Sequence, residues 1–296
     1  MRKLISKLTR HHWDLAFVEP IDGNWLSGNW QFKFVKHKAT KQWFADPFIL
    51  DVTEDNIVLL VEEYTYTLKR GRIAKLTIDR KTMTITEIKI ILDLPTHLSF
   101  PAILRYNSDV YIYPENNESG ALKAYKYNYA DDSVQFVSSL VDAPLTDAIL
   151  VTEFSEPYIF STIMTDSRGN GSTVYVYKSD SVLGKYEMTD KVELSEGIAR
   201  SAGALFRLDN RIIRPAQLFE GGRYGAGLSF QEVSYSEGSF NINEVSRILP
   251  PKDYTGMHTF NMYKGLAVVD CSAKNHPFLG PKVKFLMDVA RRLFKK

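Results

Sequence analysis

One feature of the sequence restricts the fold more than any other: a short apolar segment occurs five times along the chain. The copies begin at Asp46, Phe100, Asp147, Ala202 and His258, at intervals of 54, 47, 55 and 56 residues. A polar turn and a second apolar run follow each copy, which is the pattern of a β-hairpin. Hairpins repeated at about this interval are typical of the blades of a β-propeller.

The segments between these hairpins supply further strands. Almost no segment before residue 281 keeps a helical period, so an all-β domain is favoured. We expect outer strands at 72–78 with 84–91, 122–128 with 134–140, 173–178, and 228–235 with 240–248. The sequence therefore predicts an all-β fold, a five-bladed β-propeller over residues 1–280 with blades that start near residues 46, 100, 147, 202 and 258.

Residues 281–296 follow a different pattern, that of a short, basic amphipathic C-terminal helix. Six Lys or Arg residues stand against Asp288, while one helical face carries Val283, Leu286, Ala290, Leu293 and Phe294. Two interpretations stay open. The helix either caps the edge of a sheet or makes peripheral contact with an anionic membrane or a partner.

The composition excludes several classes of protein. A formal net charge of +2 does not fit a strongly basic nucleic-acid-binding protein, so we expect no nucleic-acid partner. Cys271 is the only cysteine, which rules out an intrachain disulfide and a thiolate zinc cluster. The amino-terminal segment lacks the apolar stretch of a secretory signal, and no transmembrane segment is evident. We expect a cytoplasmic protein, or one peripheral to the inner membrane face.

Three of the five blade heads are ionisable: Asp46, Asp147 and His258. The innermost strand of each propeller blade lies beside the central channel, so we expect these side chains to face a shared funnel. Carboxylates held together in such a funnel shift each other's pKa values, which suits acid and base catalysis on acetals. The alternative is that each aspartate only caps a turn.

Further candidates lie on the second strands of the blades. Glu115 ends one such strand and Glu63 another, where strand alternation sends only one of Glu62 and Glu63 inward. The alternative for each is a charge that faces solvent. Groups that bind sugar hydroxyls, carboxylates or phosphates stand at Arg214, Gln217 and Tyr224. For Arg214, a buried salt bridge with a propeller carboxylate is an equal alternative.

His258 also has two interpretations. It is either a central hydrogen-bonding residue or a ligand to a single structural cation such as calcium, and we expect no other metal or cofactor. Trp43, with Tyr64 and Tyr113, is a candidate stacking platform for a sugar ring, although such aromatic residues also pack between blades.

A set of short motifs carries a family resemblance. The motifs are WFADPF at 43–48, VEE at 61–63, LSFP at 98–101, YPE at 113–115, RPAQ at 214–217, YG at 224–225 and GMHTFN at 256–261. Over residues 40–270 the chain resembles the N-terminal domain of glucosamine inositolphosphorylceramide transferases, of which bacterial stand-alone relatives are known. That domain is similar to the five-bladed propellers of glycoside hydrolase family 43, a fold that the repeats indicate independently.

The resemblance implies roles for three residues. Asp46 matches the general base of the first blade in family 43, and Asp147 the third-blade aspartate that tunes and orients the acid. His258 matches the fifth-blade histidine near the central cation or water. At the head of the fourth blade, where those hydrolases have a glutamate acid, this chain has Arg200 in the sequence RSAG. Glu115, or else Glu63, is then the substitute acid.

We therefore expect a carbohydrate-active protein that binds a carbohydrate or glycoconjugate in a central funnel. The leading hypothesis is glycoside hydrolase-like chemistry on a glycosidic bond, with Asp46 as base, Asp147 as its electrostatic partner and Glu115 as acid. Two alternatives stay open because the expected acid is missing. One is a glycosyl-transfer-associated role in surface polysaccharide or glycoconjugate biosynthesis, and the other is a non-catalytic sugar-binding propeller.

Overall fold

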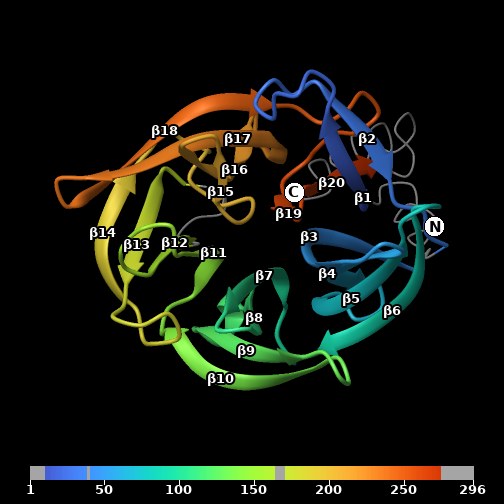
Figure 1. Ribbon diagram of the computed structural model, residues 1–296, viewed down its shortest axis with the longest axis horizontal. Helices are drawn as coiled ribbons and strands as arrows, with labels where there is room; N and C mark the ends of the chain where they lie inside the picture. Colours follow the sequence, from blue (N-terminus) through green and yellow to red (C-terminus); the bar gives the residue numbers. More distant parts are fainter. Residues whose placement is uncertain (1–10, 39–40, 164–170, 275–296) are drawn as a thin grey trace, which may run out of the picture.

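Five antiparallel sheets of four strands each surround a central axis in the computed structural model, which describes residues 11–38, 41–163 and 171–274 (Figure 1). The prediction of an all-β, five-bladed propeller is confirmed. The one helical element among the described residues is the 3-10 turn η1 (Asn117–Ser119). The predicted helix at 281–296 lies outside the described residues, and the domain boundary at residue 280 stays a prediction.

Consecutive antiparallel strands build each of the first four blades. Blade I consists of β3 (Gln42–Val52), β4 (Asn56–Thr65), β5 (Gly71–Asp79) and β6 (Thr84–Leu92). Blade II consists of β7 (Ser99–Tyr106), β8 (Asp109–Glu115), β9 (Leu122–Asn128) and β10 (Ser133–Val141). Blade III consists of β11 (Leu145–Val151), β12 (Tyr158–Ile163), β13 (Thr173–Lys178) and β14 (Glu187–Glu193). Blade IV consists of β15 (Phe206–Leu208), β16 (Arg211–Glu220), β17 (Arg223–Ser236) and β18 (Ser239–Ile248).

The two ends of the chain together form the fifth blade. Its inner strands are β19 (Phe260–Tyr263) and β20 (Leu266–Lys274), and its outer strands are β1 (His11–Pro20) and β2 (Trp30–Phe34). Strand β1 pairs with β20 over eight residue pairs, which closes the ring (Figure 1). Strands β1 and β2 were not predicted, because they stand before the first repeat in the sequence.

The innermost strands of blades I to III carry the same irregularity at their predicted heads. Asp46, Phe100 and Asp147 have φ angles of 51°, 45° and 44°, and the pairing register shifts at each of these places. Positive φ is uncommon for residues other than glycine. Because it occurs at equivalent positions in three blades, the sequence repeat corresponds to a repeated backbone conformation next to the central axis.

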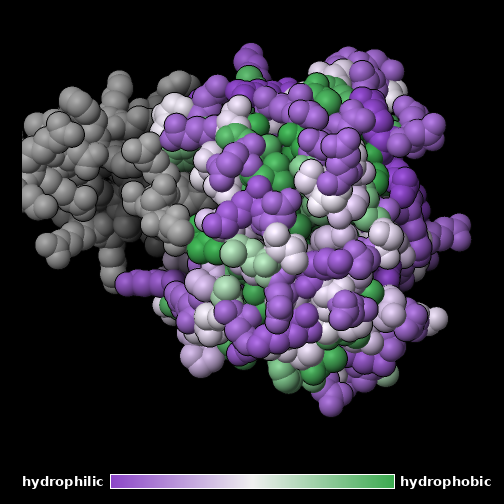
Figure 2. All heavy atoms as spheres, turned by 90° about the vertical axis from the view of Figure 1, so that its left-hand side faces the viewer, coloured by the Kyte–Doolittle hydropathy of each residue, from purple (hydrophilic) through white to green (hydrophobic). Residues whose placement is uncertain are grey.

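Apolar side chains fill the space between neighbouring blades. Between blades IV and V, for example, Phe230 and Phe260 pack edge to face with ring centroids 5.1 Å apart. The outermost strands are more exposed: β14 has no buried residue, and most residues of β18 are exposed. Figure 2 shows hydrophilic residues interspersed with hydrophobic ones on the face that carries these outer strands. The hydrophobic core therefore lies between the blades, whereas buried charged residues such as Asp46 and His258 lie near the central axis.

Candidate functional site

A cavity of about 430 Å³ opens where blades I, II, IV and V meet. Five of the predicted site residues line it: Trp43, Asp46, Glu115, Tyr224 and His258. The other lining residues are Trp13, Glu62, Tyr64, His97, Ser99, Asn117, Glu118 and Arg200. The predicted central funnel thus exists as a cavity with acidic, basic and aromatic walls, while the roles of its residues stay predictions.

Asp46 is held in its position by three hydrogen bonds. Its backbone N–H donates to Asp270 Oδ2 over 3.0 Å, and its Oδ2 accepts the backbone N–H of Phe100 over 3.0 Å. Its Oδ1 accepts the hydroxyl of Thr259 over 2.8 Å. These bonds link blades I, II and V, and they explain how a residue with positive φ is kept in place. Asp46 therefore does more than cap a turn.

His258 lies between two carboxylates. Its Nδ1 is 2.7 Å from Asp270 Oδ2, and its Nε2 is 3.4 Å from Asp46 Oδ1. Burial lowers the pKa of His258, but attraction to Asp270 and Asp46 outweighs this effect and raises it. Burial raises the pKa of Asp46 to about 6. The charge of His258 lowers this pKa, whereas repulsion from Asp147 and Asp270 raises it further. The arrangement fits an imidazolium held by two acids.

The same three residues are the candidate ligands for the predicted cation. One ligand atom from each of Asp46, His258 and Asp270 lies within 4.8 Å of the others. Asp270, however, already accepts the backbone N–H groups of His258 and Thr259 on Oδ1 and that of Asp46 on Oδ2. Calcium prefers six to eight oxygen ligands. These hydrogen bonds fit a protonated histidine beside Asp270 better than a calcium ion.

Arg200 occupies the place at the head of blade IV where the resemblance implies an acid. Its Nε donates to Asp147 Oδ2 over 2.5 Å, and its Nη2 is 3.6 Å from Glu115 Oε2. Glu115 Oε2 also accepts the backbone N–H of Asp147 over 2.9 Å. The buried Gln217 also donates from Nε2 to Asp147 Oδ2. Arg200 thus joins the two predicted acidic residues of blades II and III in one ion-pair network.

Four predicted site residues do not line the cavity: Asp147 and Gln217, which hydrogen-bond to each other, and Glu63 and Arg214. Glu63 Oε2 forms a salt bridge with Arg72 Nη2 at 2.9 Å, so that Glu62 is the glutamate of this strand that faces the cavity. Arg214 is fully buried; its side chain donates to Gln231 Oε1, to the backbone oxygen of Ala199 and to Ser201. These partners of Arg214 are neutral groups rather than the carboxylate considered from the sequence.

Aromatic rings cover two sides of the cavity. Trp43 and Tyr64, which are cross-strand partners in β3 and β4, stack with ring centroids 4.8 Å apart and an angle of 5° between the planes. Trp13 stacks on His258 at 4.1 Å, and Tyr224 meets the same imidazole edge to face at 5.3 Å. The predicted aromatic wall at Trp43 is therefore present, and a second one stands around His258.

Sequence reasoning missed Glu62, Arg200, Asp270 and Trp13 as residues of this site. Strand alternation had reduced the choice on β4 to one of two glutamates without deciding between them. Arg200 stood out only as a departure from the expected acid. Trp13 could not be placed at all, because β1 joins the last blade through pairing between the two ends of the chain.

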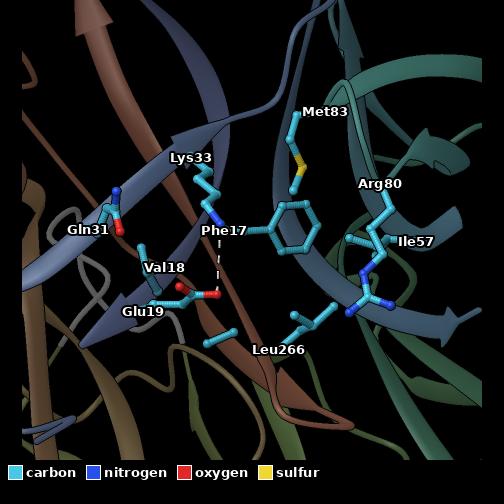
Figure 3. Close-up of a pocket in the computed structure, with 10 residues that line it drawn as sticks. Phe17, Val18, Glu19, Gln31, Lys33, Ile57, Arg80, Met83 and Leu266 are labelled. Carbon is cyan, nitrogen blue, oxygen red and sulfur yellow. Dashed lines mark ion pairs between the residues drawn. The ribbon is translucent and has the colours of Figure 1, made fainter. Parts of the chain in front are cut away.

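A second cavity lies between blades V and I and differs in chemistry (Figure 3). Its volume is about 150 Å³, and Phe17, Ile57, Met83 and Leu266 contribute apolar walls. The only ion pair drawn there joins Lys33 and Glu19 at 4.0 Å between exposed side chains. Because acidic groups do not converge there, the central cavity is the better candidate site.

Comparison with solved structures defines the class of fold. A variant of exo-β-1,3-galactanase from Phanerochaete chrysosporium with β-1,3-galactotriose has a TM-score of 0.55 and 11% identity, over 72% of this chain and 53% of that one. A glycoside hydrolase family 43 β-1,3-galactosidase with galactodeoxynojirimycin has a TM-score of 0.56 and 8% identity, over 74% and 83%. At such identities the likeness shows a shared five-bladed propeller fold.

Comparison of sequences identifies the family. The family model described as glucosamine inositolphosphorylceramide transferase 1, N-terminal, matches residues 33–262, and the chain belongs to this family. The predicted family is therefore confirmed. Glucosamine inositolphosphorylceramide transferase 1 of Arabidopsis thaliana is 28% identical over 62% of this chain, and that of Oryza sativa subsp. japonica is 27% identical over 64%. The chain spans about a quarter of the length of these relatives.

Proposed function

We propose that this chain is a carbohydrate-binding propeller whose central cavity holds the sugar part of a glycoconjugate during its assembly. The observation that carries this proposal is the cavity itself, in which hydrogen-bonding acids and a guanidinium lie between aromatic rings. Sugars offer hydroxyl groups to such polar side chains and C–H faces to such rings. The names of the relatives, which are transferases, support a role in glycosyl transfer.

Arg200 favours binding or transfer over ordinary hydrolysis. A hydrolase of the expected type needs a general acid that keeps its proton until the leaving oxygen takes it. Burial and repulsion from Asp147 raise the pKa of Glu115, but the charge of Arg200 opposes this effect. The same Glu115 oxygen also accepts the Asp147 N–H. The carboxyl of Glu115 is thus committed to the protein, which weakens its assignment as acid.

Glycosidic-bond hydrolysis is a second candidate, which one observation favours. Burial raises the pKa of Asp46 to about 6, so Asp46 is a carboxylate at neutral pH that is basic enough to activate water. In this alternative, the chain releases monosaccharide from β-1,3-galactotriose, and Asp46→Asn abolishes the release while the fold is retained. Equal turnover by Asp46→Asn and the wild type would contradict the role of Asp46 as base.

Binding is tested by isothermal titration calorimetry of the chain with galactose, N-acetylglucosamine, glucosamine and β-1,3-galactotriose. We expect at least one of these probes to bind, and Trp43→Ala to weaken its binding at least tenfold. Lys126→Met, which removes an exposed ion pair with Asp109, is the control and should bind as the wild type does. A chain that binds none of the probes, or a Trp43→Ala variant with unchanged affinity, would overturn the proposal.

We also propose that the protein works at the cytoplasmic face of a membrane. The support is the basic, amphipathic pattern of residues 281–296, together with the relatives' name, in which ceramide denotes a lipid. No helix among the described residues is long and apolar enough to cross a membrane. A chain that lacks residues 281–296 should lose sedimentation with phosphatidylglycerol vesicles, whereas equal sedimentation of both forms would contradict this proposal.

A further inference from the structure

Glu62 is a buried acid in the cavity wall that the hydrolase-like assignment does not use. It lies on β4 as the cross-strand partner of Ala45, next to Asp46, and is 6% exposed. Its Oε1 has no hydrogen-bond partner among the described residues. His97 Nε2 lies 3.4 Å from this oxygen. A buried polar atom without a partner is costly, so its presence beside a cavity indicates a ligand.

The ring of His97 is fixed in one tautomer. Its Nδ1 accepts the backbone N–H of Gly71 over 2.9 Å, so the proton of the neutral ring is on Nε2, which lies 3.4 Å from Glu62 Oε1 without forming a hydrogen bond to it. Burial lowers the pKa of His97, which keeps the ring neutral at pH 7. The backbone N–H of His97 donates to Glu118 Oε2 over 3.1 Å, and this bond connects the loop between β6 and β7 to η1.

Gly71 provides the space that the carboxyl of Glu62 occupies. A Cβ atom at this position would lie 2.5 Å from Glu62 Oε1 and 2.2 Å from the backbone oxygen of Leu98. Any larger residue would therefore displace the carboxyl or the start of blade II. Gly71 and His97 come from different elements, and both set the position of one side chain.

The electrostatic surroundings of Glu62 favour its uncharged form. Burial raises its pKa well above 4.5, and repulsion from four acids of blades I, II, III and V adds to this effect. These acids are Asp46 of β3, Glu115 of β8, Asp147 of β11 and Asp270 of β20. Glu118 and Arg200 also line the cavity, and Arg200 is already paired with Asp147 and Glu115.

We propose that Glu62 contacts the bound sugar as a carboxylic acid that donates a hydrogen bond from its OH group to an oxygen atom of the sugar. Gly71 and His97 are its positioning residues. The ligand class is then an uncharged sugar, unmodified or N-acylated, rather than an amino sugar with a free ammonium group, which would bind a carboxylate instead. This inference rests on the proposed function, because it assigns a contact within the same cavity.

The variant Glu62→Gln distinguishes a protonated Glu62 from a carboxylate. Glutamine has a similar shape and keeps a hydrogen-bond donor, but it cannot be charged. For the probe that the wild type binds best by calorimetry, we expect Glu62→Gln to bind within threefold of wild type at pH 6, and Glu62→Ala at least tenfold more weakly. As the pH rises through the folded pKa of Glu62, binding by the wild type should weaken more than binding by Glu62→Gln, because the variant has no proton to lose at this position. Gly71→Ala should behave like Glu62→Ala.

Glu63→Gln is the matched control, since Glu63 is the adjacent glutamate of the same strand and is paired with Arg72 outside the cavity. It should bind like the wild type. A tenfold loss in Glu62→Gln, or glucosamine as the preferred probe with N-acetylglucosamine unbound, would overturn the inference and leave the proposed function intact.

A second measurement needs no ligand. The infrared difference spectrum of wild type minus Glu62→Gln at pH 7 should contain the C=O stretch of a protonated carboxyl group. A carboxylate band in its place would overturn the inference alone, whereas failure to bind any probe would overturn the proposed function.

Discussion

Replacement of Arg200 by methionine should destabilise the folded protein by about 3–5 kcal/mol at pH 7. Methionine matches the length and apolar character of the arginine stem but removes the guanidinium. Arg200 is the cation that pairs with both Asp147, at 2.5 Å, and Glu115, at 3.6 Å. The variant therefore leaves two acidic side chains with no cation beside them.

The burial of the three side chains sets this magnitude. The side chains of Arg200, Asp147 and Glu115 are only 10%, 3% and 7% exposed in their ion pairs. Water screens such pairs weakly, so the cost comes from unpaired buried charge rather than from one lost contact. Exposed pairs behave differently. Lys185 and Asp142 are 2.7 Å apart, but their side chains are 65% and 58% exposed. The urea unfolding midpoint of Lys185→Met should therefore equal that of the wild type within experimental error.

Equilibrium unfolding in urea, followed by tryptophan fluorescence and circular dichroism, measures both variants. The triple variant Arg200→Met, Asp147→Asn, Glu115→Gln removes the unpaired charges and should recover a large part of the lost stability. Two results would refute the reasoning. One is an Arg200→Met variant within 1 kcal/mol of wild type, and the other is a triple variant as unstable as the single one.

Three further predictions concern the rest of the molecule. The pKa of His258 is raised above its unfolded value of 6.5. The charged imidazole therefore stabilises the fold fully below about pH 6.5, and this stabilisation is lost as the pH rises through the folded pKa. Urea unfolding from pH 6 to 9 should show this loss of stability in the wild type and not in His258→Gln. Gly203→Ala places a Cβ 1.9 Å from the backbone oxygen of Phe260 and should cost roughly 1–3 kcal/mol or more in the same assay, whereas at Gly238 no atom lies within 4 Å of a Cβ, and only the strain of its positive φ is expected. Deletion of residues 11–34 removes two of the four strands of blade V and should abolish cooperative unfolding, so a sharp transition in that chain would contradict the role of β1 as the closing strand.

The fold could be predicted because its determinants repeat along the sequence. Each blade needs an inner hairpin, and apolar runs at intervals of 47 to 56 residues report such hairpins directly. The outer strands β5, β6, β9, β10, β13, β17 and β18 also followed from local alternation. Strand β14 was missed because none of its residues is buried, which leaves no apolar pattern to detect.

The candidate site could be predicted only in part. Asp46 and His258 were found because they stand at repeat heads, and the structure places both in the cavity wall. The choice between Glu62 and Glu63 depended on which face of β4 lies toward the axis. Strand alternation shows that Glu62 and Glu63 lie on opposite faces of β4, but it does not show which face lies toward the axis. That depends on where the neighbouring blade packs.

The number of blades and most of their strands follow from the sequence, because the inner hairpins are local and repeat along the chain. The tertiary structure alone decided which charged groups meet. Arg200 pairs with Glu115 and Asp147, which lie 85 and 53 residues away, and Asp270 holds Asp46 from 224 residues away. The physical reason is that closure of the ring brings distant strands to one axis, where burial and charge, rather than sequence spacing, set the chemistry of each group.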